Sequence, residues 1–430
     1  MVFKKYDAYK NSYIQGIKLI PEKWKVMKLK YLLDSKAGFA FPSDAFSDSG
    51  TAVVRISDLL VSGVVDISKS PKLPSKFNKY LSEYFAEEGN ILMAMTGGTI
   101  GKVSIYKYEQ KSFLNQRVCK FIPKANFYPK LAWYWMNTDV WKDYIDLKAF
   151  GGAQPNISDN TIKEMQICLP DSLDTQISIC NFLDEKTYEI EQVIAIKEQQ
   201  IALLNERKQI VIQKAVTQGL DPNVPMKDSG VDGIGQIPKH WETYFNRRLF
   251  RENSRPVRGD ELPLSLSQKD GVIPSGEMKE KSLSPAHRNN FKLCFPNDLV
   301  VNRFKGHLGV FFQSNYTGIV TFHYGVFEPA KNVYTKYFEL LYHTEQYKTL
   351  YAGASNGMSI GLQNLSNLNF YRIKSIVPPL EEQKLICEYA DKVENEHNNL
   401  IHKLKSQIEK LKEYKTTLIN DAVTGKIKVA

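Results

Sequence analysis

The chain has 430 residues and a formal net charge of +10, and 43% of its residues are hydrophobic. That length exceeds one typical domain, and the apolar fraction is sufficient for packed cores. Five cysteines, an odd number without a Cys-x-x-Cys pair, argue against a disulfide framework and against a zinc module. We find no signal peptide and no apolar run of about 18 residues, so we expect a soluble, cytoplasmic protein without membrane contact.

The first recognisable element, residues 11–24, occurs a second time 217 positions later at residues 228–241. Both copies end in an Ile-Pro-x-x-Trp pattern, and six of their fourteen positions are identical. The identical pairs are Ser12/Ser229, Gly16/Gly233, Ile17/Ile234, Ile20/Ile237, Pro21/Pro238 and Trp24/Trp241. The chain is therefore a tandem duplication of about half its length, which predicts a fold with approximate internal two-fold symmetry.

The regions that follow each copy, 25–168 and 242–376, are rich in Val, Ile, Phe and Tyr with scattered Gly, Asn and Ser. This composition predicts short strands mixed with some helix. The two regions share a weaker repeat at an offset of 208, in which Gly98 and Gly101 correspond to Gly306 and Gly309.

Each region also contains an aromatic stretch and ends in a polar loop. The aromatic stretches, 131–136 and 337–342, predict helices, and we interpret their rings as core residues in preference to platforms that stack on bases. The loops, 151–158 and 353–359, carry amides, hydroxyls and nearby cations, which are the groups that read base edges from surface loops.

A charged segment follows each region and repeats without insertion at an offset of 207. Steps of three and four residues trace a mostly apolar seam through both copies, and neither contains Gly or Pro, so each predicts one long coiled-coil helix. A window of 43 residues would measure roughly 65 Å. The internal symmetry makes the pairing antiparallel, and helix stops are expected at Gln218-Gly219 and at Gly425. The first seam comprises Cys180, Leu183, Thr187, Ile190, Ile194, Lys197, Ile201, Leu204, Lys208, Val211 and Ala215; the second comprises Cys387, Ala390, Glu394, His397, Ile401, Leu404, Ile408, Leu411, Lys415, Leu418 and Ala422.

The positive charge lies outside the predicted coil. Residues 174–216 and 380–422 each carry a net charge of −2, which leaves +14 for the remaining residues. This distribution favours nucleic-acid binding by the globular regions.

This organisation resembles the specificity subunit of type I restriction-modification systems over essentially the whole chain. The residues that carry the resemblance are Ile17–Trp24 with its copy Ile234–Trp241, Val377–Ile386, and Leu418–Gly425. The first copy of the second motif is degenerate, because residues 169–176 read LPDSLDTQ where the family favours Pro-Pro-x-x-Glu-Gln. The resemblance implies a mixed α/β fold with two target recognition domains, separated by a long antiparallel two-helix coiled coil and related by internal pseudo-two-fold symmetry.

The resemblance also implies a domain order and a set of partners. We expect recognition domains at 1–168 and 226–376, a first conserved helix with its linker at 169–225, and a second helix at 377–430. The partners would be double-stranded DNA, two methyltransferase subunits and, as a further option, restriction or translocase subunits. The chain itself would bind no cofactor, while S-adenosylmethionine, ATP and Mg²⁺ would bind to the partner subunits. The DNA target would be bipartite and asymmetric, because the two recognition domains differ in sequence.

The side chains expected to contact DNA follow from the preferences of base edges. Arginine offers guanine a bidentate fork, and Asn or Gln offers adenine an amide; the alternative for each residue is a surface charge or a turn-capping amide. The candidates are Lys102, Asn115, Gln116, Arg117, Gln154 and Asn156 in the first domain, and Arg288, Arg303, Lys305, His307, Ser355 and Asn356 in the second.

The enzymatic motifs that the sequence approaches are each incomplete. Gly97–Val103 approaches a P-loop but is one residue short and carries Val103 where Ser or Thr must bind magnesium. Gly233–Pro238 fails as a dinucleotide fingerprint, and Glu277-Met-Lys279 lacks the acidic partner that nuclease metal chemistry requires. We therefore expect no catalytic residues and no metal site. Two alternatives stay open: a stand-alone DNA methyltransferase or nuclease with an unrecognised active site, and a coiled-coil scaffold that does not bind DNA.

Overall fold

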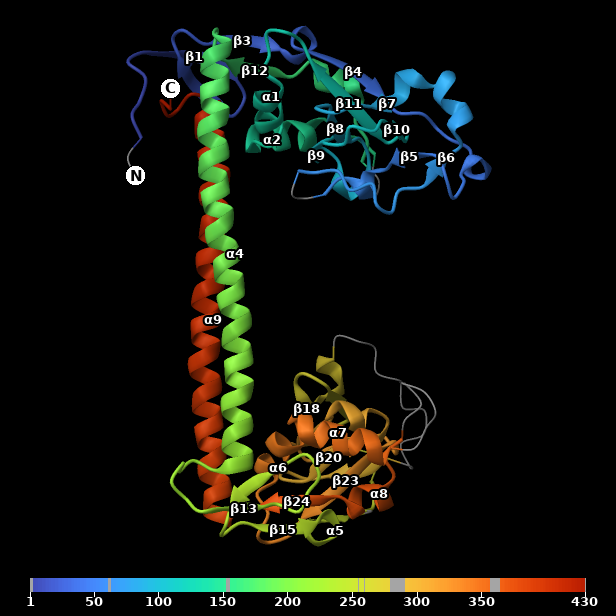
Figure 1. Cartoon of the computed structure of the whole chain (residues 1–430), viewed down its shortest axis with the longest axis vertical. Helices are drawn as coiled ribbons and strands as arrows, with labels where there is room; N and C mark the ends of the chain where they lie inside the picture. The colour runs from blue at the N-terminus through green and yellow to red at the C-terminus, as the bar shows by residue number, and fades with distance from the viewer. Residues whose placement is uncertain are drawn as a thin grey trace. The chain divides into compact units, whose positions relative to one another are not determined.

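The computed structural model describes residues 3–60, 63–151, 155–253, 255–258, 260–278, 291–355 and 364–429. The chain forms two compact units (Figure 1). Unit 1 comprises residues 1–197 and 405–430, and unit 2 comprises residues 198–404. Two long helices, α4 (Leu173–Gln218) and α9 (Leu380–Val423), each contribute one half to each unit.

Among its described residues, unit 1 contains two antiparallel strand pairs, two four-stranded sheets and three short α-helices. The paired strands are β1 (Tyr9–Ile14) with β2 (Ile17–Pro21), and β3 (Lys25–Lys28) with β12 (Gln166–Leu169). One sheet has the order β4 (Leu33–Ala37), β11 (Val118–Pro123), β8 (Ile91–Ala94), β9 (Val103–Ile105). The other has the order β6 (Lys72–Leu73), β5 (Thr51–Val54), β10 (Ser112–Leu114), β7 (Phe85–Ala86), with β5 and β10 parallel. The helices are α1 (Pro129–Trp135), α2 (Asp139–Lys148) and α3 (Asp159–Lys163). Short 3₁₀ turns are η1 (Leu29–Tyr31), η2 (Ser43–Ala45), η3 (Ile56–Asp58), η4 (Ser75–Lys79), η5 (Ser82–Tyr84) and η6 (Gly97–Thr99).

Unit 2 repeats the first of these sheets and both of the strand pairs. The pairs are β13 (Met226–Asp228) with β14 (Gln236–Pro238), and β15 (Glu242–Phe245) with β24 (Lys374–Val377). The four-stranded sheet has the order β16 (Phe250–Glu252), β23 (Tyr324–Pro329), β20 (Leu299–Asn302), β21 (Phe311–Gln313). Two further pairs are β17 (Leu264–Ser267) with β18 (Gly271–Pro274), and β19 (Lys292–Cys294) with β22 (Gly318–Val320). The helices are α5 (Asn246–Leu249), α6 (Thr335–Tyr342), α7 (Glu345–Ala354) and α8 (Asn367–Arg372), and the 3₁₀ turns are η7 (Ser275–Glu277) and η9 (Arg303–Leu308).

The aromatic stretches form helices that pack into the cores, as the sequence predicts. In α1, Leu131, Tyr134 and Trp135 are buried, and in α6 Tyr337, Phe338 and Tyr342 are fully buried. The helix that follows each stretch begins at an equivalent threonine, because the hydroxyl of Thr138 accepts from the Trp141 amide and that of Thr344 accepts from the Tyr347 amide.

One buried glutamine shows that the duplication is also a duplication of the fold. The side chain of Gln176 accepts a hydrogen bond from the Tyr128 amide (2.9 Å) and donates to the carbonyls of Asn126 and Pro170. Gln383 repeats all three bonds with Tyr334 (2.8 Å), Asn332 and Pro378. Both amides are buried, so each holds the start of its long helix against its own domain.

The two long helices pair antiparallel in each unit, as predicted (Figure 1). In unit 1, Lys197 contacts Gln407 (2.7 Å) while Lys415 contacts Glu191 (2.5 Å), so the residue number rises along one helix as it falls along the other. In unit 2, Lys208 reaches Asn398 (3.3 Å) and Glu394 (3.7 Å). The predicted helix stops are confirmed, because Gly219 and Gly425 have φ of 80° and 75°.

One predicted seam position is wrong. Glu394 is exposed, and the neighbouring Val393 is 6% exposed and takes its place in the packed face. Glu394 lies at the edge of the helix pair, where its carboxylate stays in solvent 3.7 Å from the Lys208 ammonium, and the predicted register resumes at His397. The other positions of both predicted seams are buried or half-buried. No helix among the described residues has the length and apolar character that crossing a membrane requires.

Candidate nucleic-acid interface

In unit 1, three segments that are distant in sequence meet at the end of β8. The Met95 amide donates to the Arg117 carbonyl (2.9 Å), and the Met95 carbonyl accepts from the Ile157 amide (3.1 Å). The Gly97 amide donates to the Pro155 carbonyl (2.9 Å). These bonds place the turn before β11 and the end of the polar loop on the two sides of Met95.

Five of the six predicted DNA-contacting residues of unit 1 belong to these segments or flank them. Asn115, Gln116 and Arg117 form a β-turn closed by the bond from the Val118 amide to the Asn115 carbonyl (2.8 Å), and Gln116 and Arg117 are exposed. Asn156 is exposed, and Lys102 adjoins β8 through the bond from the Ala94 amide to the Lys102 carbonyl (3.0 Å). The side chain of Asn115 also accepts from the Arg117 amide (3.3 Å), which is a turn-capping contact. Gln154 lies outside the described residues.

Unit 2 contains the same arrangement of backbone. The Leu365 amide donates to the Arg303 carbonyl (2.9 Å), as Ile157 does to Met95, and the Tyr324 amide closes a turn on the Thr321 carbonyl (3.0 Å). Asn302 pairs with Tyr324 between β20 and β23 as Ala94 pairs with Val118 between β8 and β11. Residues 321–324 are therefore the structural counterpart of residues 115–118.

The predicted residues of unit 2 have different surroundings. The Arg303 guanidinium donates to Glu252 (2.7 Å) and to Asn367 (2.7 Å), so it anchors η9 to β16 and α8. Lys305 is exposed, and His307 is half-buried in the same turn. The Ser355 hydroxyl donates to the Tyr351 carbonyl (2.7 Å) at the end of α7. Arg288 and Asn356 lie outside the described residues.

The sequence reasoning missed three residues on this part of unit 2: Phe304, Phe322 and His323. Phe322 and His323 occupy the turn that corresponds to Gln116 and Arg117, and Phe304 follows the anchored Arg303. An alignment of the two turns by strand register identifies them, whereas a search for hydrogen-bonding side chains passes over phenylalanine.

A family model for the type I restriction modification DNA specificity domain matches residues 21–205 and 238–410. The chain belongs to this family. Each match covers one globular domain and most of the long helix that follows it, so the family domain occurs twice in this chain.

Individual relatives agree with this assignment. The chain is 28% identical over 211 residues to the type I restriction enzyme MjaVIII specificity subunit of Methanocaldococcus jannaschii, a match that covers 46% of this chain and 48% of that protein. It is 24% identical over 266 residues to the EcoBI specificity subunit of Escherichia coli, covering 60% of this chain and 53% of that one. The matched region thus spans about half the length of these two relatives.

Two solved structures share the fold. A chain from a study of complex assembly and conformational transition of the type I R-M system matches with a TM-score of 0.69 at 13% identity, over 95% of this chain and 99% of that one. The HsdS subunit of Thermoanaerobacter tengcongensis matches with a TM-score of 0.53 at 15% identity, over 96% and 100%.

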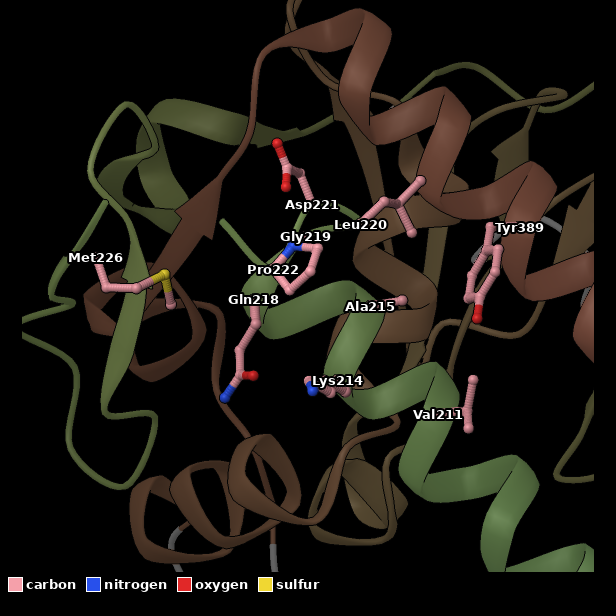
Figure 2. A pocket seen from close by; sticks show the side chains of 10 residues that line it. All are labelled: Val211, Lys214, Ala215, Gln218, Gly219, Leu220, Asp221, Pro222, Met226 and Tyr389. Atoms are coloured by element: carbon pink, nitrogen blue, oxygen red, sulfur yellow. The ribbon is translucent and has the colours of Figure 1, made fainter. Parts of the chain in front are cut away.

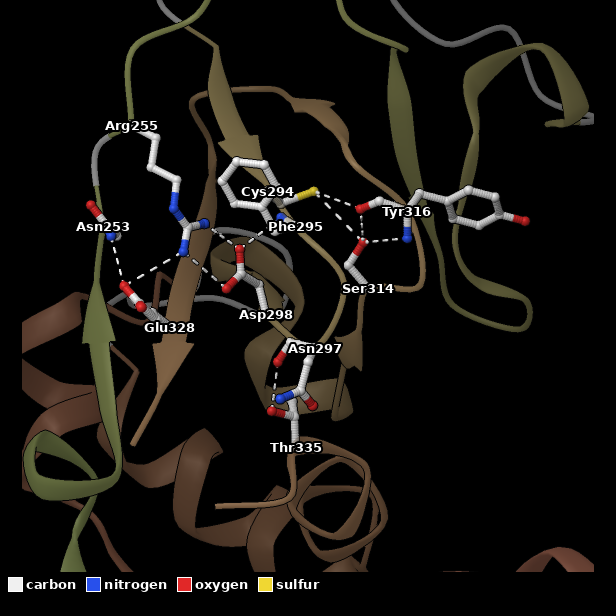
Figure 3. A network of polar contacts seen from close by, with 10 residues as sticks. All are labelled: Asn253, Arg255, Cys294, Phe295, Asn297, Asp298, Ser314, Tyr316, Glu328 and Thr335. Carbon is white, nitrogen blue, oxygen red and sulfur yellow. Dashed lines mark hydrogen bonds and ion pairs between the residues drawn. The ribbon is translucent and has the colours of Figure 1, made fainter. Parts of the chain in front are cut away.

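Within this family fold, a second arginine of unit 2 has an internal role (Figure 3). Arg255 pairs with the buried carboxylate of Asp298, which also accepts from the Phe295 amide (2.8 Å). The guanidinium lies 4.6 Å from the centre of the Phe295 ring and 3.5 Å from Glu328. Burial raises the pKa of Asp298 above its ordinary value, and the contacts with Arg255 and Phe295 oppose that rise. In unit 1 the equivalent residue is a neutral amide, Asn90, whose oxygen accepts from the Glu87 amide (3.1 Å).

A cavity of about 450 Å³ lies at the end of α4 in unit 2 (Figure 2). Its walls come from the last turns of α4, the linker that follows, β13 and α9, and no residue of η9 or of the turn 321–324 lines it. In unit 1 the counterpart of its Tyr389 is Phe182, whose ring packs against Phe3 with ring centres 5.7 Å apart. We assign this cavity to helix packing and not to recognition.

The described residues contain no group of three or more His, Cys, Asp or Glu side chains placed to hold a metal ion. The two seam cysteines are buried, and burial raises the pKa of both Cys180 and Cys387 to about 12. Their thiols are therefore neutral packing groups at physiological pH.

Proposed function

We propose that this chain is the sequence-recognition subunit of a type I restriction-modification complex and reads a bipartite, asymmetric target in double-stranded DNA. One observation carries the proposal: the family match covers both halves, and the two halves hold the same turn on the same strands with different side chains at its tip. We call the paired strands with their turn backbone the frame, and the exposed residues 116–117 and 322–323 the tips. Equivalent frames with different tips suit two domains that each read a different short sequence.

The proposed division of labour follows from charge and geometry. Positive charge outside the helices neutralises phosphates and supplies affinity that falls with rising salt. In unit 1, Arg117 and Gln116 project from an exposed turn, where the guanidinium and the amide match the acceptors of guanine and adenine in the major groove. Asn115 begins that turn, Lys102 and Asn156 belong to neighbouring segments, and all three are assigned to the same surface.

The partner subunits belong to the same proposal. The chain carries no catalytic residues in this scheme, and it docks two methyltransferase subunits, with restriction subunits as a further addition. Methyl transfer, ATP-driven steps and their S-adenosylmethionine, ATP and Mg²⁺ then belong to the partners. The family match and the shared fold support this assignment.

The test is a map of methylated bases in the host genome with and without this chain. A bipartite motif that disappears when the chain is removed is the expected result. Purified chain mixed with S-adenosylmethionine and DNA should give no turnover until methyltransferase subunits are added. Turnover by the chain alone would establish the alternative, a stand-alone methyltransferase, and no salt-dependent DNA binding would favour a scaffold.

A second experiment tests whether the helices set the spacing of the target. Lys197 contacts Gln407, so residues 194–200 and 404–410 are opposed segments of one heptad each. Deleting both shortens the helix pair by roughly 10 Å, about three base pairs of DNA. We expect the unread gap in the methylated motif to shorten accordingly or methylation to cease. A full-activity variant with the original gap would contradict the proposal.

A further inference from the structure

Unit 2 exposes a cluster of aromatic rings on the turn that corresponds to the polar turn of unit 1. Phe304 is 44% exposed and Phe322 is 50% exposed. The His323 ring joins them, with its centre 3.8 Å from that of Phe322 and 5.4 Å from that of Phe304. Two half-exposed phenylalanines in contact with one imidazole form an apolar projection on a surface where single apolar residues are the rule.

The backbone beneath these rings is held firmly. The side chain of Asn302 accepts from the amides of Phe304 and Lys305 (3.1 and 3.3 Å), and Arg303 is anchored to Glu252 and Asn367. The turn that carries Phe322 and His323 is closed by the bond from the amide of Tyr324, the first residue of β23, to the Thr321 carbonyl. The rings are therefore presented in a defined position, as a recognition surface requires.

The charge around the rings suits a polyanion. Neither residues 303–308 nor residues 321–324 contain a carboxylate, and the exposed Lys305 directly follows Phe304. The equivalent turn in unit 1 carries Gln116 and Arg117, which suit hydrogen-bonded base edges. An apolar surface beside a cation suits an apolar feature of DNA, and in the major groove that feature is the C5-methyl group of thymine.

We propose that unit 2 reads thymine through its methyl group, with Phe304 and Phe322 as the specificity-determining side chains and Lys305 at the neighbouring phosphate. This inference rests on the proposed function, since it names the chemical feature that one of the two recognition domains selects. Unit 1 reads polar base edges, and unit 2 reads an apolar one.

The experiment uses the full chain and its mapped target, with thymine replaced by deoxyuracil in one half-site at a time. Deoxyuracil keeps the base pair and removes only the methyl group. The proteins are wild type, the double variant Phe304→Ala/Phe322→Ala, the single variant Phe322→Leu, and Phe245→Ala as a matched control. Phe245 lies on β15, is 37% exposed, and belongs to the same unit. Dissociation constants are measured at one salt concentration, and thermal melting confirms that each variant is folded.

For wild type, Phe245→Ala and Phe322→Leu, we expect each deoxyuracil in one particular half-site to weaken binding roughly fourfold, the value of one buried methyl group. The double variant should bind the thymine target more weakly and respond no further to deoxyuracil in that half-site. Replacement in the other half-site should affect all four proteins equally.

Several results would overturn the inference. Equal deoxyuracil effects in wild type and the double variant would show that the rings do not contact methyl groups. The inference would also fail if one half-site of the mapped target contained no A·T pair, and deoxyuracil in the other half-site weakened binding equally in wild type and in the double variant. Loss of methyltransferase binding with unchanged DNA binding would assign the cluster to a protein partner. Failure of wild type to bind any DNA is a separate outcome, because it removes the proposed function itself.

Discussion

The turn at 115–118 in unit 1 and the turn at 321–324 in unit 2 have the same backbone and different chemistry. Both close with one bond between the first and fourth residues, and both lead into an inner strand, β11 or β23, of two equivalent four-stranded sheets. The exposed tip is Gln116-Arg117 in one and Phe322-His323 in the other. The comparison teaches that duplication preserved the paired strands and the turn backbone, which strand pairing constrains, while the exposed side chains at the turn diverged.

The largest expected effect concerns an equivalent position at which the two units differ, the buried Asp298 in unit 2 and Asn90 in unit 1. Arg255→Ala leaves the buried Asp298 carboxylate without its cation, so we expect a loss of about 3–5 kcal/mol in the unfolding free energy of unit 2. Urea denaturation, monitored with a spectroscopic probe in each unit, measures this loss of unfolding free energy. The matched variant is Arg255→Ala/Asp298→Asn, which copies the neutral Asn90 of unit 1 and should recover most of the loss. A double variant as unstable as the single one would contradict this explanation.

The same variant should depend on pH in a defined direction. Burial already raises the pKa of Asp298, and removing Arg255 raises it further. Between the unfolded and the folded pKa the folded state binds more protons, so the stability of Arg255→Ala falls as pH rises through that window and recovers toward acid pH. The double variant with Asp298→Asn serves as the control, because it should lack this dependence.

The next prediction concerns a feature that the two units share, the buried glutamine at the start of each long helix. Gln176→Ala and Gln383→Ala each remove three equivalent hydrogen bonds and leave buried main-chain groups unpaired. We expect about 2–3 kcal/mol of destabilisation from either change. Hydrogen exchange should localise each loss to the unit that carries the variant. Markedly unequal losses would show that the two frames are not energetically equivalent.

A smaller effect tests the polar tip. Arg117→Ala should weaken binding to the mapped target by about 1–3 kcal/mol and relax specificity at one base pair in one half-site. The control is Lys107→Ala, which removes a cation from an exposed site in the same unit. A uniform loss on all DNA sequences would mean that Arg117 contacts phosphate instead of a base.

The smallest effect concerns backbone strain. Tyr13 has φ of 59° and is 89% exposed, while its counterpart Gly230 has φ of 61°. Tyrosine in this conformation is strained and buries almost nothing, so Tyr13→Gly should stabilise unit 1 by about 1 kcal/mol. The reciprocal change, Gly230→Tyr, should destabilise unit 2 by a similar amount. Thermal melting of both variants provides the check, and a destabilised Tyr13→Gly would indicate that the tyrosine makes a stabilising contact.

Local sequence patterns predicted the frame well. The repeats at 11–24 and 228–241, the two long helices, their stops at Gly219 and Gly425 and their antiparallel pairing all follow from identity, periodicity and capping residues. The seam failed at Glu394, where Val393 is buried instead and the carboxylate stays exposed beside Lys208. Which of two adjacent residues is buried depends on the contact with the facing helix, which a fixed seven-residue count does not include.

The candidate site was predicted less completely. Asn115–Arg117 and Asn156 were selected by residue type, and the structure brings their segments together at Met95. Arg303 was selected in the same way, yet its partner Glu252 lies 51 residues away in sequence. Phe304 and Phe322 were passed over, because residue type alone does not show that an aromatic ring is exposed.

The sequence by itself determined the duplication, the helices and the distribution of charge, because these depend on local propensity, periodicity and composition. The tertiary structure decided which cations remain exposed and which are bound internally, and which side chains stand at the two equivalent tips. Ion pairs and turn contacts join residues far apart in the chain, so their outcome depends on the packed fold.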